Sequence, residues 1–333
     1  MTRIGVVGGG SWGTTLANLM ALKGVKVDLW VREEEVYSQI KEKRINGMFL
    51  TGITLSDNLT PVRSFKEVCG EKDFIVIVVP SHFFRNILHQ LSPFLASSIP
   101  LIVATKGIEN DTFMTMNQIT ESVLPGDFNN RFACLSGPSF AREVCYKQPT
   151  AVTLASSNKE LAAKLQRLIS TDYFRVYTTQ DVVGVEIGGA LKNVIAIAAG
   201  VSDGLGFGSN SRAALITRGL AEITRLGVSM GAKPATFAGL AGIGDLILTC
   251  TGDLSRNRKV GLQIAEGIST EEIVSGMKMV AEGVKTSCSA YNLAKKMNIE
   301  MPITTEVYNI IYQERNPRDA VKDLMDRELK DEN

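Results

Sequence analysis

The sequence predicts a two-domain fold, with an α/β domain over residues 1–180 followed by an all-α domain over residues 181–333. Three observations support this prediction. The chain of 333 residues is longer than one hydrophobic core usually organises. Before residue 180, short β-branched apolar runs alternate with helical patterns, which is typical of a doubly wound parallel sheet. After that point, long helical patterns replace the strand-like runs.

Six apolar runs in the first half are predicted to be strands. Near-continuous runs of this kind suit strands that are buried on both faces of a parallel sheet. They cover residues 3–7, 25–31, 74–79, 101–104, 151–155 and 173–177. Residues 11–24, between the first two runs, have a helical pattern. Its apolar stripe consists of Leu16, Leu19, Met20 and Leu22.

The second half is predicted to be helical throughout. Its clearest patterns cover residues 186–201, 211–227, 288–298 and 305–313. The first of these carries Lys192 and Asn193 among small apolar residues. Burying an ammonium in such surroundings is costly unless the group is paired or loses its proton. Lys192 is therefore either a functional residue or a lysine that snorkels from a core helix to solvent.

The composition argues against several classes of protein. Lys and Arg number 36 and Asp and Glu 35, so no charge excess indicates a nucleic-acid or membrane partner. Five widely spaced cysteines indicate reduced thiols, and no His/Cys/Asp cluster predicts a metal site. No apolar run reaches the ~18 residues that span a bilayer, and the N-terminus does not resemble a signal peptide. We therefore expect a cytoplasmic protein.

A glycine-rich turn follows the first predicted strand. Gly8, Gly10 and Gly13 form a G-x-G-x-x-G pattern that opens a helix. In a dinucleotide site the first glycine makes the turn, the second lets a pyrophosphate approach the backbone, and the third lets helix and strand pack closely. The helix N-terminus adds N–H groups and a positive dipole end. The pattern thus predicts a dinucleotide site, with a purely structural turn as the alternative.

The end of the second predicted strand bears on the choice of coenzyme. An NAD-selective site usually places Asp or Glu there to hold the ribose hydroxyls. Here Arg32 lies near the tip with Glu33 next to it, and Asp28 falls in mid-strand, where a structural or surface role is expected. An arginine at the tip can accommodate a 2′-phosphate. We expect NADP or NAD as cofactor, with NADPH used at least as well as NADH.

Six motifs carry a resemblance to a known family. They are GGGSWGTTLA, ATKGIE, LSGPSFARE, ALKNVIAIAAG, AGIGDLILTCTG and SRNRKVG, in that order. Together they resemble the bacterial NAD(P)-dependent glycerol-3-phosphate dehydrogenases. The resemblance implies a Rossmann-like N-terminal domain, a helical substrate-binding domain and a homodimer. It also implies an oxidoreductase that interconverts dihydroxyacetone phosphate and sn-glycerol 3-phosphate and so feeds glycerophospholipid synthesis.

The resemblance further implies roles for single residues. Lys192 matches the proton donor and acceptor. The positions that match the substrate site are Lys106, Gly137, Ser139, Lys192, Asn193, Asp245, Ser255, Arg256 and Asn257. The three glycines of the turn, Gly8, Gly10 and Gly13, belong to the expected cofactor site. The other positions that match this site are Ser11, Trp12, Arg32, Lys106, Ala141, Arg256, Val280 and Glu282.

These residue types suit the reduction of a ketone. The developing negative charge on oxygen needs a cation and a proton donor, and burial can lower the pKa of a lysine to ~7–8, where both protonation states are accessible. Gly188 and Gly189, one turn before Lys192, are expected to leave room for a substrate. Arg256 is predicted to clamp the substrate phosphate, with Asn257 adding amide donors, and a solvated basic loop is the alternative.

Other interpretations remain open at the level of sequence. Asp245 is expected to bond Lys192 or a substrate hydroxyl, with a helix N-cap as the alternative. His82 and His89 are the other acid–base candidates, and a surface or packing role is expected for both. The alternative functions are a related two-domain dehydrogenase of a 3-hydroxy acid or sugar acid phosphate, and a non-catalytic dinucleotide-sensing protein.

Overall fold

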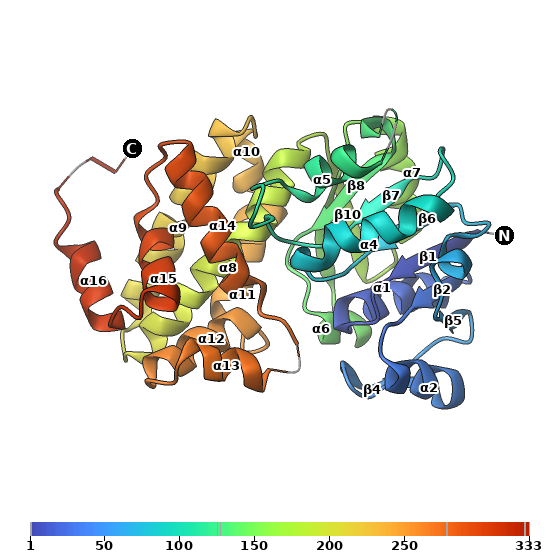
Figure 1. Cartoon of the computed structure of the whole chain (residues 1–333), viewed down its shortest axis with the longest axis horizontal. Coiled ribbons are helices and arrows are strands. Elements are labelled where there is room, and N and C mark those ends of the chain that lie inside the picture. Colours follow the sequence, from blue (N-terminus) through green and yellow to red (C-terminus); the bar gives the residue numbers. More distant parts are fainter. Residues whose placement is uncertain (1, 125, 127, 278, 330, 333) are drawn as a thin grey trace.

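The computed structural model describes residues 2–124, 126, 128–277, 279–329 and 331–332. A sheet half and a helical half lie side by side (Figure 1). The strands of the described residues are β1 (Arg3–Val7), β2 (Lys26–Trp30), β3 (Ile45–Asn46), β4 (Leu50–Thr54), β5 (Leu59–Val62), β6 (Phe74–Ile77), β7 (Leu101–Val103), β8 (Phe132–Ser136), β9 (Thr150–Ala155) and β10 (Phe174–Thr179).

Helices cover the sheet and make up the other half of the molecule (Figure 1). In the sheet half they are α1 (Ser11–Leu22), α2 (Glu34–Lys43), α3 (Phe65–Cys69), α4 (Phe84–Leu91), α5 (Met116–Val123), α6 (Ala141–Cys145) and α7 (Lys159–Ile169). In the helical half they are α8 (Val182–Gly204), α9 (Ser209–Ser229), α10 (Pro234–Phe237), α11 (Asp245–Thr251), α12 (Arg256–Ala265), α13 (Thr270–Gly276), α14 (Glu282–Lys296), α15 (Pro302–Tyr312) and α16 (Pro317–Met325).

One sheet of eight strands has the order β10-β9-β8-β7-β6-β1-β2-β5. All six predicted strands are present in it, as β1, β2, β6, β7, β9 and β10. Because β1 lies between β2 and β6 and pairs in parallel with both, the carboxyl ends of these strands share one edge of the sheet. The turn after β1 and the loops after β6 and β7 therefore emerge on the same side.

The sheet departs from the sequence prediction in two respects. It is not purely parallel, because β8 and β9 pair antiparallel. It also contains β5 and β8, which the apolar pattern does not predict, and the antiparallel hairpin of β3 and β4 is likewise not predicted. β5 is an edge strand that contains Pro61, which is tolerated at an edge but weakens the strand pattern. In α1, Leu22 is 52% exposed and does not belong to the buried stripe.

Helix α8 is the centre of the helical half and packs against α9, α11, α12 and α14. Two glycines allow α12 to approach it closely. A Cβ on Gly200 would lie 2.0 Å from the Arg258 carbonyl oxygen, and one on Gly261 would lie 2.1 Å from the Ile197 carbonyl oxygen. Any larger side chain would push the two helices apart, and with them the residues that each brings to the site.

The glycines before Lys192 have the same packing role. A Cβ on Gly188 would meet the Ala241 carbonyl oxygen at 2.6 Å, and one on Gly189 would meet the Ser136 Oγ at 2.7 Å. Protein atoms therefore fill the space beside both glycines. The expectation that they leave room for a substrate is wrong, because they let the segment before α11 and the end of β8 approach α8 instead.

Two described helical stretches, Val182–Gly204 and Pro234–Thr251, have the length and apolar composition of a membrane span. In the first, 83% of the most apolar window is buried inside the protein, and in the second 39% is buried. The first stretch is α8, whose apolar surface is covered by the surrounding helices. Its composition is that of a core helix.

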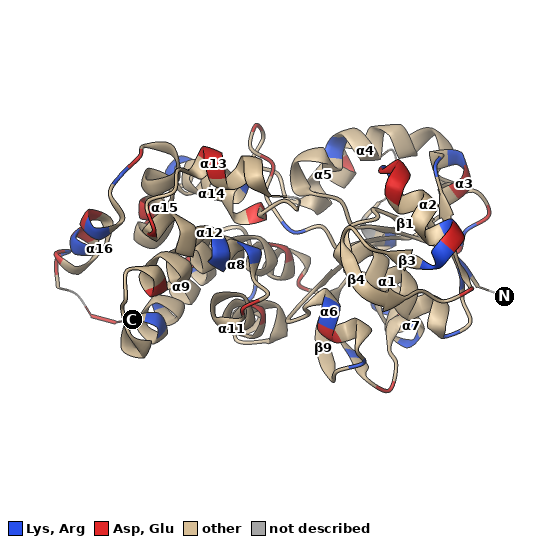
Figure 2. Cartoon of the chain, turned by 90° about the horizontal axis from the view of Figure 1, so that it is seen from below, with Lys and Arg blue, Asp and Glu red and all other residues tan. Residues whose placement is uncertain are grey.

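Charged residues of both signs are interspersed along the ribbons of the two halves (Figure 2). A few are buried, among them Asp181, Glu186, Lys192, Glu222 and Asp245. Buried charges are rare in proteins unless they are paired or serve a function. The contacts of Lys192 and Asp245 define the candidate site.

Candidate active site

The glycine-rich turn has the geometry that a dinucleotide requires. Gly8 has φ +127°, and a Cβ there would lie 2.2 Å from the Val78 carbonyl oxygen. A Cβ on Gly13 would lie 1.9 Å from the Gly8 carbonyl oxygen, so α1 packs against the turn. A Cβ on Gly10, by contrast, would have no described atom within 4 Å outside its chain neighbours. The open side over Gly10, at the N-terminus of α1, fits a pyrophosphate.

Other predicted cofactor residues lie around this turn. Ser11 and Trp12 begin α1, and the Trp12 ring is 6.5 Å from that of Phe174. Ala141 begins α6, and its carbonyl oxygen accepts a bond of 3.4 Å from the Thr15 hydroxyl on α1. The contact brings α6 and the glycine-rich helix together.

Arg32 follows β2 and lies at the surface. Its side chain is 67% exposed, forms an ion pair of 2.9 Å with Glu33, and places its guanidinium carbon 5.8 Å from the centre of the Phe83 ring. Asp28 instead pairs with Lys72 at 2.8 Å. The structure thus assigns Asp28 to an ion pair within the sheet half and leaves Arg32 accessible at the end of β2.

The chemistry-bearing cluster consists of Lys106, Lys192 and Asp245. Lys192 lies on α8, Asp245 begins α11, and Lys106 is in the loop after β7. The two oxygens of the Asp245 carboxylate accept one bond from each lysine, 2.5 Å from Lys192 Nζ and 2.7 Å from Lys106 Nζ. The Lys192 and Asp245 side chains are 9% and 2% exposed. Lys192 does not snorkel to solvent, and Asp245 makes the predicted bond to it.

The surroundings of the cluster shift two pKa values. Burial lowers the pKa of Lys192 to about 8, with the Lys106 charge acting in the same direction and Asp245 opposing both. At Asp245, burial acts to raise the pKa, but the two ammonium groups outweigh it and lower the pKa below its usual value. The carboxylate is therefore ionised at neutral pH, and both protonation states of Lys192 are accessible.

Two polar residues that the sequence analysis misses complete the cluster. Lys192 Nζ donates to the Thr249 hydroxyl at 3.0 Å, and that hydroxyl donates to the Asp245 carbonyl oxygen at 2.6 Å. Thr249 lies one helical turn after Asp245, a spacing that could have indicated it. The Ser136 hydroxyl at the end of β8 lies 3.4 Å from the Asp245 carboxylate.

The loop after β8 reaches the same carboxylate. The Gly137 N–H donates to Asp245 at 3.3 Å, and Gly137 has φ +133°, a conformation that favours glycine. Its carbonyl oxygen lies 3.5 Å from Lys106 Nζ and accepts a bond of 3.0 Å from the Ser139 hydroxyl. The predicted substrate residues of this loop therefore lie beside the lysine–aspartate cluster.

The start of α12 is joined to the helix that carries Lys192. Asn257 donates from its side-chain amide to the Asn193 side-chain oxygen at 2.8 Å, and its own oxygen accepts from the Gly283 N–H at 2.9 Å. The Ser255 hydroxyl caps α12 by accepting from the Arg258 N–H at 3.2 Å. An accepting hydroxyl still has its own proton to donate. Ser255 and Asn257, two of the predicted substrate residues, are thus held in place by hydrogen bonds to backbone and side-chain groups.

The predicted residues Arg256, Val280 and Glu282 form a second group. The Arg256 guanidinium donates to the Val280 carbonyl oxygen at 2.6 Å. The Glu282 carboxylate accepts from the Ser81 N–H at 3.1 Å and from its hydroxyl at 2.5 Å. Burial raises the pKa of Glu282 and lowers that of Arg256. Ser81 follows β6, so these bonds join the two halves of the molecule, a link that no sequence pattern indicates.

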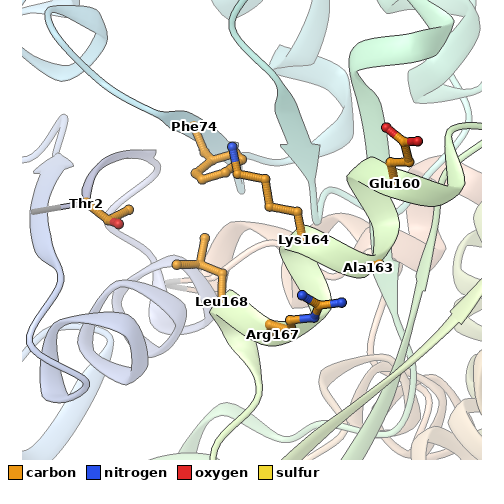
Figure 3. A pocket seen from close by; sticks show the side chains of 7 residues that line it. All are labelled: Thr2, Phe74, Glu160, Ala163, Lys164, Arg167 and Leu168. Atoms are coloured by element: carbon orange, nitrogen blue, oxygen red, sulfur yellow. The ribbon is translucent and has the colours of Figure 1, made fainter.

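A surface hollow lies away from this site. It has a volume of about 550 Å³ and is lined by Thr2, Phe74, Glu160, Ala163, Lys164, Arg167 and Leu168. Figure 3 shows the Lys164 side chain over the Phe74 ring, at 5.0 Å from its centre. Thr2 precedes β1 and Phe74 begins β6, so the hollow is at the amino ends of the strands. In open α/β sheets ligands bind at the carboxyl ends, where Gly8 lies.

Comparisons with known proteins relate both halves of the chain to one family. Residues 3–162 match the family model of the NAD-dependent glycerol-3-phosphate dehydrogenase N-terminus, and residues 181–322 match that of the C-terminus. A glycerol-3-phosphate dehydrogenase (NAD(P)+) of Geobacter sulfurreducens is 57% identical over 330 residues, covering 99% of this chain and 98% of its own. The equivalent protein of Geobacter metallireducens is also 57% identical over 330 residues, with the same coverage.

A solved structure of a glycerol-3-phosphate dehydrogenase is similar to this chain over nearly its whole length. The crystal structure of glycerol-3-phosphate dehydrogenase from Coxiella burnetii superposes with a TM-score of 0.93 at 38% identity, covering 98% of this chain and 99% of its own. The agreement extends over both halves, so it includes the glycine-rich turn and the helices that carry Lys192 and Asp245. With both family models matched along most of its length, the chain belongs to the NAD-dependent glycerol-3-phosphate dehydrogenase family.

Proposed function

We propose that Lys192 is the proton donor and acceptor in the interconversion of dihydroxyacetone phosphate and sn-glycerol 3-phosphate by this chain. The observation that carries the proposal is the buried Lys192 ammonium, held 2.5 Å from the Asp245 carboxylate. The type of reaction follows from the chain's membership in a family of NAD(P)-dependent dehydrogenases. When NAD or NADP is bound at the turn after β1, it donates or accepts the hydride.

The ammonium groups of Lys192 and Lys106 are both suited to stabilise negative charge on the reacting oxygen of the substrate. Reduction of a ketone builds negative charge there, and two ammonium groups on one carboxylate leave an excess of one positive charge. Because the pKa of Lys192 is lowered to about 8, its ammonium can give a proton to the oxygen, and the resulting neutral amine can take the proton back in the reverse direction. Asp245 holds both lysines in place, and Thr249 fixes the direction of the Lys192 amine.

The start of α12 is the proposed place of the substrate phosphate. Arg256 offers a planar guanidinium with several N–H donors, of which one bonds Val280. Ser255 and Asn257 lie on either side of it in the chain, and Asn257 contacts Asn193, the neighbour of Lys192. Binding the phosphate at α12 would therefore hold the carbonyl near Lys192, which is how contacts to a non-reacting group contribute to catalysis.

The remaining proposals concern the protein as a whole. We divide the chain into a coenzyme domain over residues 1–180 and a substrate domain over 181–333, because the last strand ends at Thr179 and α8 begins at Val182. The exposed Arg32 supports use of NADPH at least as well as NADH. We also propose a cytoplasmic homodimer that supplies glycerophospholipid synthesis.

The test is an assay of the purified chain with dihydroxyacetone phosphate, following NADPH and NADH absorbance in parallel. Lys192→Ala should lower kcat by ~10²–10⁴-fold, because a positioned acid–base group is lost. Coenzyme affinity should stay close to that of the unmodified chain. Lys295→Ala, at an exposed position on α14, is the control. A Lys192→Ala variant that retains more than about a tenth of kcat would remove Lys192 from this role.

A further inference from the structure

A buried asparagine of the β3–β4 hairpin contacts the glycine-rich turn. Asn46 is 0% exposed and lies far from the turn in the sequence. Its side-chain amide donates to the Gly9 carbonyl oxygen at 2.9 Å and to the Thr14 hydroxyl at 2.9 Å. Its oxygen accepts from the Phe49 N–H at 3.1 Å, which fixes the side chain within its own hairpin. None of the roles assigned to the site residues accounts for this asparagine.

Two donors converge on the same carbonyl. The Thr14 hydroxyl, which accepts from Asn46, itself donates to the Gly9 carbonyl oxygen at 3.1 Å. The other side of Gly9 is also occupied, because a Cβ there would lie 2.4 Å from the Val31 Cγ1. The Gly9 carbonyl is therefore held in one direction by Asn46 and Thr14.

Fixing this carbonyl also fixes an N–H group. The Gly9 carbonyl and the Gly10 N–H belong to one planar peptide unit, and this structure contains no cis peptide bond among its described residues. In a trans peptide the two groups point in opposite directions. With its carbonyl turned to Asn46, the peptide directs the Gly10 N–H to the opposite side. If the peptide rotated, its carbonyl dipole would leave Asn46 and could face an anion bound at the turn.

We propose that Asn46 is a positioning residue for coenzyme binding, because it holds the Gly9–Gly10 peptide with its N–H directed toward the pyrophosphate. The proposal rests on the dinucleotide site proposed above and adds a determinant from outside the glycine motif. It concerns the part of the coenzyme that NAD and NADP share. Losing Asn46 should therefore weaken the binding of NADPH and NADH to the same extent, whichever coenzyme the residues near the ribose 2′ position favour.

The chain offers a matched control. Asn18 is 4% exposed, and its side-chain oxygen accepts from the Ser56 N–H at 2.8 Å. It thus links α1 to the chain just after the same hairpin, as Asn46 does, but through a backbone group away from the glycine turn. Both substitutions to Ala remove a buried amide that anchors this segment. Only Asn46→Ala removes a donor to the Gly9 carbonyl.

The experiment measures Kd for NADPH and for NADH by fluorescence titration, together with Tm, for the unmodified chain, Asn46→Ala, Asn18→Ala and Thr14→Val. We expect Asn46→Ala to raise both Kd values about tenfold, the effect of one lost hydrogen bond. Asn18→Ala should raise them less than about twofold at a similar loss of Tm. KM for dihydroxyacetone phosphate at saturating coenzyme should change little in Asn46→Ala.

Three outcomes decide the proposal. Equal increases of Kd in Asn46→Ala and Asn18→Ala, or an unchanged Kd in Asn46→Ala, would overturn it. If Asn46→Ala does not fold, Thr14→Val decides, because it removes the second donor to the Gly9 carbonyl and should raise both Kd values about threefold. An unchanged Kd in a folded Thr14→Val would then reject the inference. Failure of the unmodified chain to bind either coenzyme would instead reject the proposed function.

Discussion

The glycine-rich turn and the Lys192 cluster use opposite physical means. The turn, from Gly8 to Gly13, is contiguous in the sequence and depends on small residues, backbone direction and the open space over Gly10. The cluster joins residues that are 53 and 139 positions apart, and it depends on buried charges. The turn is therefore sensitive to added volume, whereas the cluster is sensitive to charge and pH. Four substitutions or conditions test this contrast.

Neutralising the shared carboxylate should have the largest effect. Asp245→Asn keeps the volume but leaves the buried Lys192 ammonium and the partly buried Lys106 ammonium without their counter-charge. Lys192 is therefore expected to lose its proton at neutral pH. Reduction of dihydroxyacetone phosphate should fall about 100-fold in kcat, within the range for loss of a proton donor. Coenzyme Kd should change much less than kcat, because the glycine-rich turn is not altered. Asp253→Asn, at an exposed acid with 95% side-chain exposure, is the control. A fall of less than about threefold would show that the carboxylate is dispensable.

Removing the Arg256 guanidinium tests the proposed phosphate site at the start of α12. Arg256→Ala should lower kcat/KM for dihydroxyacetone phosphate ~10–100-fold and kcat/KM for unphosphorylated dihydroxyacetone much less, because only the former presents a phosphate. Lys259→Ala, an exposed cation on the same helix, controls for the loss of charge. Equal losses with both substrates would mean that Arg256 does not bind the phosphate.

Adding one methyl group to the turn tests the coenzyme side. Gly10→Ala should leave Tm nearly unchanged, because no described atom outside the chain neighbours lies within 4 Å of the new Cβ. It should raise Kd for both coenzymes about tenfold, since the pyrophosphate must approach the backbone there. Gly208→Ala is the matched control, because Gly208 precedes α9 with a similarly open position. Unchanged Kd values in Gly10→Ala would place the pyrophosphate elsewhere.

The smallest effect is a pH dependence that belongs to the cluster alone. Ketone reduction needs protonated Lys192, so kcat/KM for dihydroxyacetone phosphate should be level at lower pH and fall as the pH rises through about 8. Oxidation of glycerol 3-phosphate needs the neutral amine and should rise over the same range. Asp245, whose pKa is lowered, stays ionised throughout. Asp245→Asn should move both transitions to lower pH, whereas Gly10→Ala should move neither.

Much of the fold follows from local patterns. The apolar runs predict six strands because a strand buried on both faces must be apolar almost throughout. β5 and β8 escape prediction because Pro61 and the polar end at Ser136 interrupt the pattern. The β3–β4 hairpin is too short to show a periodicity, and its Asn46 gains significance only through its contact with Gly9. The antiparallel pairing of β8 with β9 depends on non-local partners that no strand specifies by itself.

By itself, the sequence determined the α/β and helical halves, the position of the glycine-rich turn and the presence of an unusual lysine among apolar residues. These features rest on neighbouring residues, whose period and conformational freedom can be read along the chain. Only the tertiary structure decided that Asp245 bridges Lys192 and Lys106, that Thr249 and Ser136 complete the cluster, and that Gly188 and Gly189 serve packing rather than substrate access. Burial and charge pairing depend on segments that meet only in the folded chain, and these set the pKa of Lys192.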